Sequence, residues 1–274
     1  MFMGPADLKI SWHEMLLTAL EASIEAGNAI MEVYRTKFEV EYKDDQSPLT
    51  FADKSADNII NRYLKTTGIP VLSEESAVTD YNVRKNWKTL WIVDPLDGTK
   101  EFIQRNDEFT VNIALISGQK PVLGVVFAPA IGELYFGSAH SGAFFASMRE
   151  NTVVILTDII ATSKKLPLHK TNNEFVVLGS RSHMNAETTA YINSLQKNHP
   201  NLKVRSRGSS LKFCAVADGS CQLYPRFGTT MEWDTAAGQA ILEIAGGSVT
   251  EAHEGYPLLY NKESLKNPHF IAKQ

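Results

Sequence analysis

Apolar and polar positions follow a helical period at the start of the chain. Behind the S-x-x-E pattern of Ser11 and Glu14, apolar residues recur at helical spacing up to Tyr34, which predicts a long amphipathic helix. After a polar stretch, Thr50 and Asp53 restart the helical pattern in TFADKSADNIINRYL. The segment IPVLSEES then has the pattern of a short strand that runs into an acidic turn.

A run of short strands follows the second predicted helix. LWIVD has the pattern of a buried strand, with four apolar residues before its aspartate, and the segments FTVNIALI, PVLGVVFAP, ELYFGSA and GAFF follow with close turn signals. Such a run predicts an antiparallel meander. The polar connection around ATSKKLPLHKTNNE is the candidate boundary, and we expect an N-terminal α+β half at 1–150 and a C-terminal α/β half at 151–274.

The second half alternates between strand and helix patterns. The strands FVVLGS, LKVRS and CQLYPRF alternate with the helices MNAETTAYINSLQK, SLKFCAVADG and DTAAGQAILEIAGG, and SVTEA is expected as the final strand. Helices and sheets in alternation predict packed layers. The expected fold is α+β, a layered α-β-α-β-α sandwich with a mostly antiparallel N-terminal sheet and a smaller α/β C-terminal half.

The composition and net charge of the chain indicate which classes of ligand it can bind. The chain has 274 residues, of which 43% are hydrophobic and 21% charged, and this length suffices for one large domain or two tightly packed ones. Its formal net charge of −4 supplies no global positive field, so we expect no nucleic acid polymer as a partner. An anionic substrate would therefore need metal ions or local Lys and Arg side chains.

Cysteine usage and apolar runs indicate the compartment. Cys214 and Cys221 form neither a disulfide framework nor a CxxC pair, which favours buried thiols and a reducing cytoplasm. We expect no signal peptide and no transmembrane segment, because no apolar run approaches the roughly 20 residues of a membrane span. Peripheral association with the inner face of the cell membrane is left open.

Carboxylates stand at the ends of apolar elements in three separated segments. Glu74 and Glu75 follow IPVL, Asp94 and Asp97 follow LWIV, and Asp234 opens a helix after MEW. Mg²⁺ prefers oxygen ligands, and two ions sharing one pocket need several carboxylates. The pattern hints at a divalent metal site.

DPLDG is the most informative of these segments. Pro95 fixes φ in a predicted turn that can aim the two flanking aspartates and the Leu96 carbonyl at one point. Gly98 lets the backbone approach a phosphate, and the amides of the step to Thr99 are available as donors.

Each acidic segment also has a plain interpretation. Pro-x-Asp-Gly is ordinary turn chemistry, and SEES alone fits a solvated acidic loop. Asp234 fits a helix N-cap, and Asp53 fits the acid of a capping box. Spacing alone leaves these alternatives open.

The order and wording of LSEES, WIVDPLDGTKEF and WDTAAG resemble the inositol monophosphatase superfamily of lithium-sensitive, magnesium-dependent phosphatases, over nearly the whole chain. Four stretches are similar to its bacterial 3'(2'),5'-bisphosphate nucleotidase branch: DGTKEFIQRNDEFTVNIALI, SRSH, GSSLKFC and LYPRFG. That branch removes the 3'-phosphate of 3'-phosphoadenosine 5'-phosphate, a by-product of sulfate assimilation, leaving AMP. The resemblance implies the same reaction and a sugar-phosphatase-like fold.

The resemblance also implies roles for individual residues. It implies a site for two or three Mg²⁺ ions whose ligands are Glu74, Asp94, the Leu96 carbonyl, Asp97 and Asp234. It implies three catalytic residues: Glu74, Thr99, which helps to activate a metal-bound water, and Asp53, which orients Thr99. We expect direct in-line attack by water without a phosphoenzyme.

For the substrate, the resemblance implies contacts from Glu74, Leu96, Asp97, Gly98, Thr99, His183, Ser209, Lys212, Arg226 and Asp234. His183, Ser209, Lys212 and Arg226 match residues that hold the nucleotide's second phosphate. Inositol monophosphatases usually have a small residue at the position of Lys212, which favours a bisphosphate. Plain alternatives are an N-cap for Ser209, a solvated Lys212, and a surface acid pairing with Arg226.

Two other functions are alternatives to this hydrolysis. An inositol or sugar monophosphatase would keep the reaction and change the substrate, and a catalytically inactive regulator would bind a phosphate ligand only. The leading hypothesis remains hydrolysis of adenosine 3',5'-bisphosphate, a small-molecule partner, by a cytoplasmic monomer or homodimer.

Overall fold

Helices α1 (Trp12–Tyr34) and α2 (Phe51–Leu64) begin with the capping boxes that the sequence predicts. The Ser11 hydroxyl accepts a hydrogen bond from the Glu14 N–H at 3.2 Å, and the Glu14 carboxylate accepts one from the Ser11 N–H at 2.7 Å. The computed structural model describes residues 10–42, 48–77, 79–148, 156–169, 174–180 and 184–274.

A seven-stranded sheet follows in chain order: β3 (Val71–Ser73), β4 (Thr89–Asp97), β5 (Thr110–Ser117), β6 (Lys120–Ala128), β7 (Glu133–Ser138), β8 (Gly142–Ser147) and β9 (Lys164–Lys165). Among the described strands of this sheet, β3 and β4 pair in parallel and all other neighbours are antiparallel, so the predicted antiparallel meander is confirmed. Strand β9 lies beyond residue 150 and pairs with β8, so the large sheet reaches into the polar connection.

Several short elements have no counterpart among the predictions: β1 (Val40–Tyr42), β2 (Pro48–Thr50), the 3₁₀ helix η2 (Lys65–Thr67), α3 (Tyr81–Arg84), α4 (Thr99–Ile103) and α5 (Leu156–Thr162). Each is too short to show a hydrophobic period of its own.

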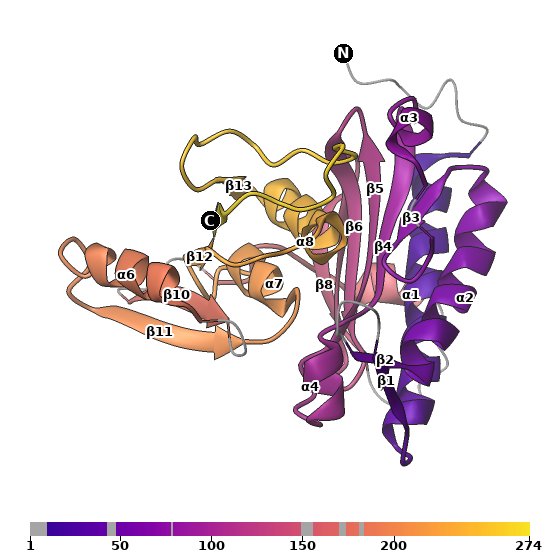
Figure 1. Cartoon of the computed structure of the whole chain (residues 1–274), viewed down its shortest axis with the longest axis horizontal. Coiled ribbons are helices and arrows are strands. Elements are labelled where there is room, and N and C mark those ends of the chain that lie inside the picture. Colours follow the sequence, from indigo (N-terminus) through magenta and orange to yellow (C-terminus); the bar gives the residue numbers. More distant parts are fainter. Residues whose placement is uncertain (1–9, 43–47, 78, 149–155, 170–173, 181–183) are drawn as a thin grey trace.

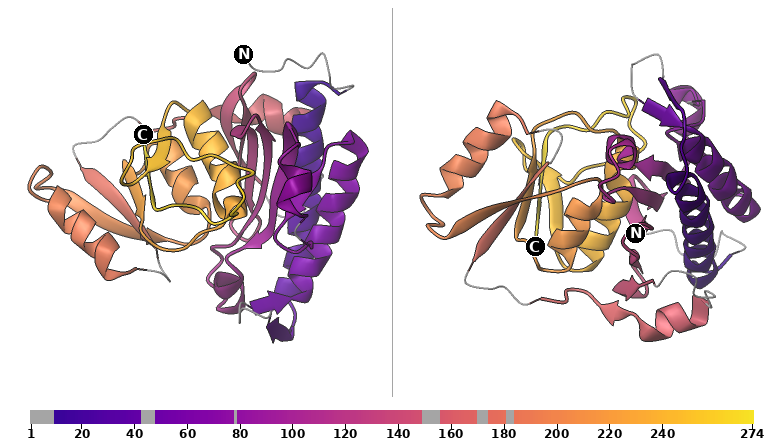
Figure 2. Two further views of the ribbon diagram at one scale, coloured as in Figure 1. Left: turned by 45° about the horizontal axis from the view of Figure 1, so that its top comes forward. Right: turned by 90° about the horizontal axis from the view of Figure 1, so that it is seen from below.

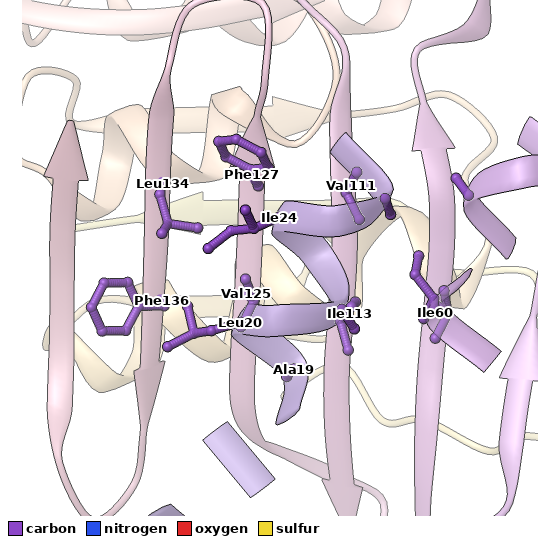
Figure 3. Close-up of a cluster of buried hydrophobic side chains, with 14 of the residues drawn as sticks. Ala19, Leu20, Ile24, Ile60, Val111, Ile113, Val125, Phe127, Leu134 and Phe136 are labelled. Atoms are coloured by element: carbon purple, nitrogen blue, oxygen red, sulfur yellow. The ribbon is translucent and has the colours of Figure 1, made fainter. Parts of the chain in front are cut away.

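Side chains of the large sheet alternate between two apolar clusters. One face packs against α1 and α2, and Figure 3 shows part of this cluster: Ala19, Leu20, Ile24, Ile60, Val111, Ile113, Val125, Phe127, Leu134 and Phe136. The intervening residues Ala114, Val126 and Tyr135 belong to a second cluster together with residues of the C-terminal half. Because both faces of the sheet are buried, the sequences of its strands are nearly continuous apolar runs.

The C-terminal half forms a five-stranded sheet in the order β11-β10-β12-β14-β13. Its elements are β10 (Phe175–Ser180), α6 (Ala186–Leu195), β11 (Leu202–Arg207), α7 (Leu211–Ala217), β12 (Leu223–Arg226), α8 (Glu232–Ile244), β13 (Ser248–Glu251) and β14 (Phe270–Lys273). The expectation that SVTEA is the final strand was wrong, because β14 follows it and pairs with both β12 and β13. Four residues after a long irregular segment carry no clear strand signal.

The elements stack in five layers, which Figure 1 shows edge-on: α6, the small sheet, α7 with α8, the large sheet, and α1 with α2. Figure 2 shows α6 and β11, in orange, at the end opposite the indigo and purple α1 and α2. The layered α+β fold is therefore confirmed.

Helix α8 lies very close to the large sheet. A Cβ placed on Gly124 of β6 would lie 2.4 Å from the Ala237 carbonyl oxygen, so only glycine fits there. Within the part of the chain that the structure describes, no helix combines the length and the apolar character needed to cross a membrane.

Candidate active site

The segment WIVDPLDGTKEF is a strand that continues directly into a helix. Strand β4 pairs with β5 at Asp94 and again at Asp97, with a β-bulge between them, and α4 begins at Thr99 after Gly98 with φ of 90°. The predicted turn is therefore wrong. Pro95 is tolerated because a bulged residue makes no ladder hydrogen bond. The bulge leaves Asp94, Leu96 and Asp97 close together at the C-terminal end of β4.

Two of the site's aspartates are anchored through one oxygen to a nearby backbone amide. Asp94 Oδ1 accepts from the Leu96 N–H at 3.1 Å, and Asp234 Oδ2 accepts from the Met231 N–H at 2.9 Å. Asp234 is the third residue of α8, which begins at Glu232, so the alternative of an N-cap does not hold. One oxygen of each carboxylate is thus held by the backbone, and the other oxygen takes no part in that hydrogen bond.

Asp97 is held from both halves of the chain. Its Oδ2 accepts from the Ser210 N–H at 2.6 Å, from Asn112 Nδ2 at 3.2 Å and from the Thr110 hydroxyl at 3.4 Å. Ser210 also donates its hydroxyl to the Asp234 carbonyl at 2.9 Å. One hydrogen-bond network therefore joins β4, β5, the start of α7 and α8.

Three carboxylates converge beside this network. Glu74, Asp94 and Asp234 each offer an oxygen, and these atoms all lie within 4.8 Å of one another. They come from the end of β3, from β4 and from α8, and Leu96 and Asp97 line the same cavity. Rigid oxygen donors in such a group suit a divalent cation.

Burial places these carboxylates under electrostatic strain. Burial, followed by the charges of Glu74 and Asp97, raises the pKa of Asp94 well above its usual range. Burial and the charge of Asp97 raise the pKa of Asp234 to about 8. The pKa of Asp97 is also raised by burial, against the opposing effect of Lys212. A bound divalent cation would offset this repulsion, so the residues fit a metal.

Asp53 uses its two oxygens for two tasks. Oδ2 accepts from the Thr50 N–H at 2.7 Å and from the Thr50 hydroxyl at 2.6 Å, while Oδ1 lies 3.3 Å from the Thr99 hydroxyl. Burial raises the pKa of Asp53 to about 6, with the Thr50 hydrogen bonds acting in the opposite direction. The capping box and the contact with Thr99 therefore coexist.

A cavity of about 290 Å³ opens over these groups. It brings together most of the residues expected from the sequence: Glu74, Asp94, Leu96, Asp97, Gly98, Thr99, Ser209, Lys212, Arg226 and Asp234. Asp53 does not line it and reaches it through Thr99. His183 lies outside the described residues.

Lys212 is buried in the wall of this cavity, near Asp97. Its Nζ donates to the Ser209 carbonyl at 2.6 Å and to the Arg207 carbonyl at 3.2 Å, and only 6% of the residue is exposed. The alternative of a solvated side chain is therefore wrong. Burial lowers the pKa of Lys212 to about 8, while Asp97 acts to raise it.

Two polar atoms beside Lys212 are buried without a partner among the described residues: Arg226 Nε and Ser209 Oγ. Arg226 donates Nη2 to the Thr229 carbonyl at 3.0 Å and forms no ion pair with an acid in the described part of the chain. Ser209 has φ of 43°, and the N-cap of α7 is Ser210. Neither plain alternative is seen, and buried unsatisfied donors at a cavity are typical of a ligand site.

Sequence reasoning missed other residues that line the cavity: Lys100, Glu101, Gly208, Phe213, Tyr224, Thr229, Thr230 and Thr235. It also missed Thr110 and Asn112, which hold Asp97. Asn112 did leave a signal, because it is a polar side chain in the middle of the apolar strand FTVNIALI.

Comparison with known proteins agrees with this geometry. The model of the inositol monophosphatase family matches residues 11–273. The 3'(2'),5'-bisphosphate nucleotidase CysQ of Escherichia coli (strain K12) is 45% identical over 261 residues, which cover 93% of this chain and 98% of that protein. The protein of the same name from Haemophilus influenzae is 34% identical over 265 residues, covering 94% and 92%.

Solved structures show the same relationship. The crystal structure of CysQ from Bacteroides thetaiotaomicron, a bacterial member of the inositol monophosphatase family, superposes with a TM-score of 0.87 at 47% identity, covering 96% of this chain and 97% of that one. The extragenic suppressor protein suhB from Bartonella henselae has a TM-score of 0.69 at 26% identity, covering 94% and 92%. This chain belongs to the inositol monophosphatase family.

Proposed function

We propose that this protein is a magnesium-dependent 3'(2'),5'-bisphosphate nucleotidase. It hydrolyses the 3'-phosphate of adenosine 3',5'-bisphosphate and releases AMP and phosphate. The relatives of that name cover nearly the whole chain at up to 46% identity, which supports both the enzyme class and the substrate.

The observation that carries the proposal is the charge distribution within one cavity. Glu74, Asp94 and Asp234 converge in it, and the cationic side chains of Lys212 and Arg226 line the same space, with Lys212 close enough to Asp97 for each to shift the pKa of the other. The acidic side suits metal ions around a phosphate that reacts, and the cationic side suits a phosphate that is only bound. A molecule with two phosphates satisfies both sides.

In this proposal, two or three Mg²⁺ ions are held by the carboxylates of Glu74, Asp94, Asp97 and Asp234 and by the Leu96 carbonyl. When bound, they would lower the pKa of a water molecule and neutralise charge on the transferring phosphoryl group. The anchored oxygens of the aspartates keep this donor set in place before any ion arrives.

Thr99 and Asp53 move the proton of the attacking water in the proposed reaction. The Thr99 hydroxyl lies 3.3 Å from Asp53 Oδ1 and 3.3 Å from the Leu96 carbonyl, so it can accept from water and donate to the carboxylate. A pKa of about 6 keeps Asp53 mostly ionised at neutral pH and still basic enough to share the proton. The proposal also includes Glu74, which lines the same cavity, as a residue that orients the water.

The remaining contacts bind the substrate. The amides at Gly98 and Thr99 open α4 without helical acceptors and suit the oxygens of the reacting phosphate. The Ser209 hydroxyl and the Lys212 and Arg226 side chains suit the second phosphate, and the proposal includes His183 with them. The unpartnered Ser209 Oγ and Arg226 Nε support this assignment.

Phosphate release from adenosine 3',5'-bisphosphate and from inositol 1-phosphate, measured with Mg²⁺ and with EDTA, tests the proposal. We expect Mg²⁺-dependent turnover with the higher kcat/KM on the bisphosphate. Faster turnover of the inositol ester would make the protein an inositol monophosphatase. Binding of the nucleotide without phosphate release would make it an inactive phosphate-binding regulator.

We place the enzyme in the cytoplasm as a monomer or homodimer. Cys214 and Cys221 are both buried and unpaired, as in a reducing compartment. Light scattering of the purified chain tests the oligomeric state, and fractionation of cells tests both the location and any association with the membrane face.

A further inference from the structure

A second group of possible metal ligands lies in the C-terminal half, away from the carboxylates of the active site. Glu187, His253 and His269 each offer one ligand atom, and these three atoms lie within 4.8 Å of one another. Glu187 is the second residue of α6, His253 follows β13, and His269 immediately precedes β14. Three separate segments of the chain therefore converge on one point.

Fixed backbone contacts hold these segments together. The Asn185 side chain caps α6 by accepting from the Thr188 N–H at 2.8 Å, and its Nδ2 donates to the Phe227 carbonyl at 2.7 Å. The Ala252 N–H donates to the His269 carbonyl at 2.8 Å, which continues the β13–β14 ladder. The convergence is thus a product of the fold and not of one mobile loop.

An aromatic wall limits how the two imidazoles can turn. The buried Phe227 ring lies edge-on to both, with ring centroids 5.6 Å from His269 and 6.3 Å from His253. The two imidazole centroids are 6.2 Å apart. Glu187 in α6 and His269 next to β14 lie on regular elements, and His253 lies in the turn directly after β13, beside the same packed ring. Such placement limits the reorganisation needed to close on an ion.

We propose that Glu187, His253 and His269 form a binding site for a divalent transition metal of the zinc type. Two imidazoles and one carboxylate suit Zn²⁺ and its neighbours, whereas Mg²⁺ takes oxygen ligands and keeps its waters. His269 Nδ1 lies 3.8 Å from Glu187 Oε1. Around a tetrahedral Zn²⁺ with bonds of about 2.0–2.1 Å, neighbouring ligand atoms are about 3.3 Å apart, so small side-chain rotations suffice.

The simpler interpretation is a surface ion pair between His269 and Glu187. Their side chains are 37% and 51% exposed, and exposed pairs contribute little to stability. That interpretation does not account for His253, whose ligand atom lies within the same 4.8 Å group. A metal accounts for all three residues, and water or a ligand from solution would complete its coordination.

Isothermal titration of the tag-free, full-length protein with Zn²⁺ in saturating Mg²⁺ tests the site. Because Zn²⁺ can also enter the carboxylate pocket, the titration is repeated with Asp94→Asn, which removes a carboxylate there. We expect one Zn²⁺ binding event that persists in Asp94→Asn. His253→Gln and His269→Gln should each weaken this event at least about a hundredfold, and Glu187→Gln about tenfold, since even residues outside the first ligand shell can change metal affinity by 10–100-fold.

The matched control is His199→Gln, because His199 stacks on Phe175 and belongs to neither site. It should bind Zn²⁺ as the wild type does. Co²⁺ gives a second readout, since its visible absorption rises when the octahedral water shell gives way to a tetrahedral site of the kind that Zn²⁺ prefers. Unchanged Zn²⁺ affinity in His253→Gln and His269→Gln, or loss of all Zn²⁺ binding in Asp94→Asn, would overturn the proposal. Circular dichroism of each variant shows that its fold is intact.

Discussion

The two sides of the active-site cavity are built in different ways. On the acidic side, each aspartate is anchored through one oxygen to a backbone amide, at the end of a rigid strand or inside a helix. On the cationic side, Lys212 in the first turn of α7 donates to the Arg207 and Ser209 carbonyls that precede this helix, and Arg226 Nε and Ser209 Oγ have no partner among the described residues. The aspartates of the acidic side have their backbone hydrogen-bond partners without substrate, whereas two polar atoms of the cationic side have none among the described residues.

This difference separates chemistry from recognition. In the proposed reaction, the pre-positioned carboxylates organise metal ions around any phosphate ester, so they would determine whether hydrolysis occurs. Unsatisfied donors gain most from the ligand that completes them, so in this proposal they determine which ester is chosen. Substitutions on the acidic side should therefore lower turnover of every substrate, and those on the cationic side should change the ratio between substrates.

The largest effect is expected from Asp97→Asn. The amide keeps the shape and can still accept from the Ser210 N–H, but it removes a charge that the metal ions need. We expect kcat to fall roughly a thousandfold or more on both the bisphosphate and the monophosphate. The control is Asp158→Asn in the exposed part of α5, which should be silent. A near-normal kcat with an intact circular dichroism spectrum would remove Asp97 from the site.

The next effect is a change of specificity in Lys212→Met. Methionine keeps an unbranched apolar stem of similar length and removes the ammonium group. We expect kcat/KM to fall about 10–100-fold for adenosine 3',5'-bisphosphate, as for loss of a charged hydrogen bond, and much less for inositol 1-phosphate. Lys65→Met, at an exposed position in η2, is the control. Equal losses on both substrates would show that Lys212 serves Asp97 instead of the second phosphate.

Asn112→Ala tests the network behind the acidic side. Asn112 Nδ2 donates to Asp97 Oδ2 at 3.2 Å and to the Ser210 hydroxyl at 2.9 Å, so its loss should loosen Asp97. We expect the Mg²⁺ concentration for half-maximal activity to rise about tenfold, with a smaller fall in kcat at saturating Mg²⁺. The exposed Asn193→Ala in α6 is the control. An unchanged Mg²⁺ requirement would limit Asn112 to a structural role.

The smallest effect is on stability without metal. The pKa of Asp234 is raised from 3.8 to about 8 in the folded protein, so its contribution to stability is present below pH 4 and is lost as pH rises through 8. Asp53 acts with the same sign up to about pH 6. The Tm of the protein in EDTA should therefore fall by a few degrees between pH 5.5 and 8.

Above pH 8 the lowered pKa of Lys212 makes stability rise with pH, so the fall in Tm is expected only up to pH 8. Adding Mg²⁺ should raise Tm more at pH 8 than at pH 5.5, because the carboxylates then bind it without losing protons. Asp234→Asn should flatten the slope of Tm against pH. A Tm that rises with pH in EDTA would contradict the assigned direction of these pKa shifts.

The sequence predicts the acidic side of the cavity better than the cationic side. The motifs around Glu74, Asp94 and Asp234 place carboxylates at the ends of apolar elements, and those elements form where the hydrophobic pattern predicts them. The β-bulge at Asp97 was not predictable, because its register depends on pairing with β5 and not on local turn chemistry. Burial of Lys212 depends on contacts between segments distant in the chain, which a helical period does not reveal.

Helix α8 explains why the last motif contains Ala-Ala-Gly after its aspartate. Ala236 and Ala237 are buried, the Ala237 carbonyl lies against Gly124 of β6, and a Cβ on Gly238 would lie 2.6 Å from Phe213 of α7, so small residues let α8 fit closely between the large sheet and α7. Asp234 therefore joins Glu74 and Asp94 only when α8 has packed against the large sheet. During synthesis, the ribosome releases those two carboxylates long before the third. A truncated or half-folded chain thus lacks part of the proposed metal site, and in this proposal any metal-dependent turnover reports a molecule whose assembly is finished.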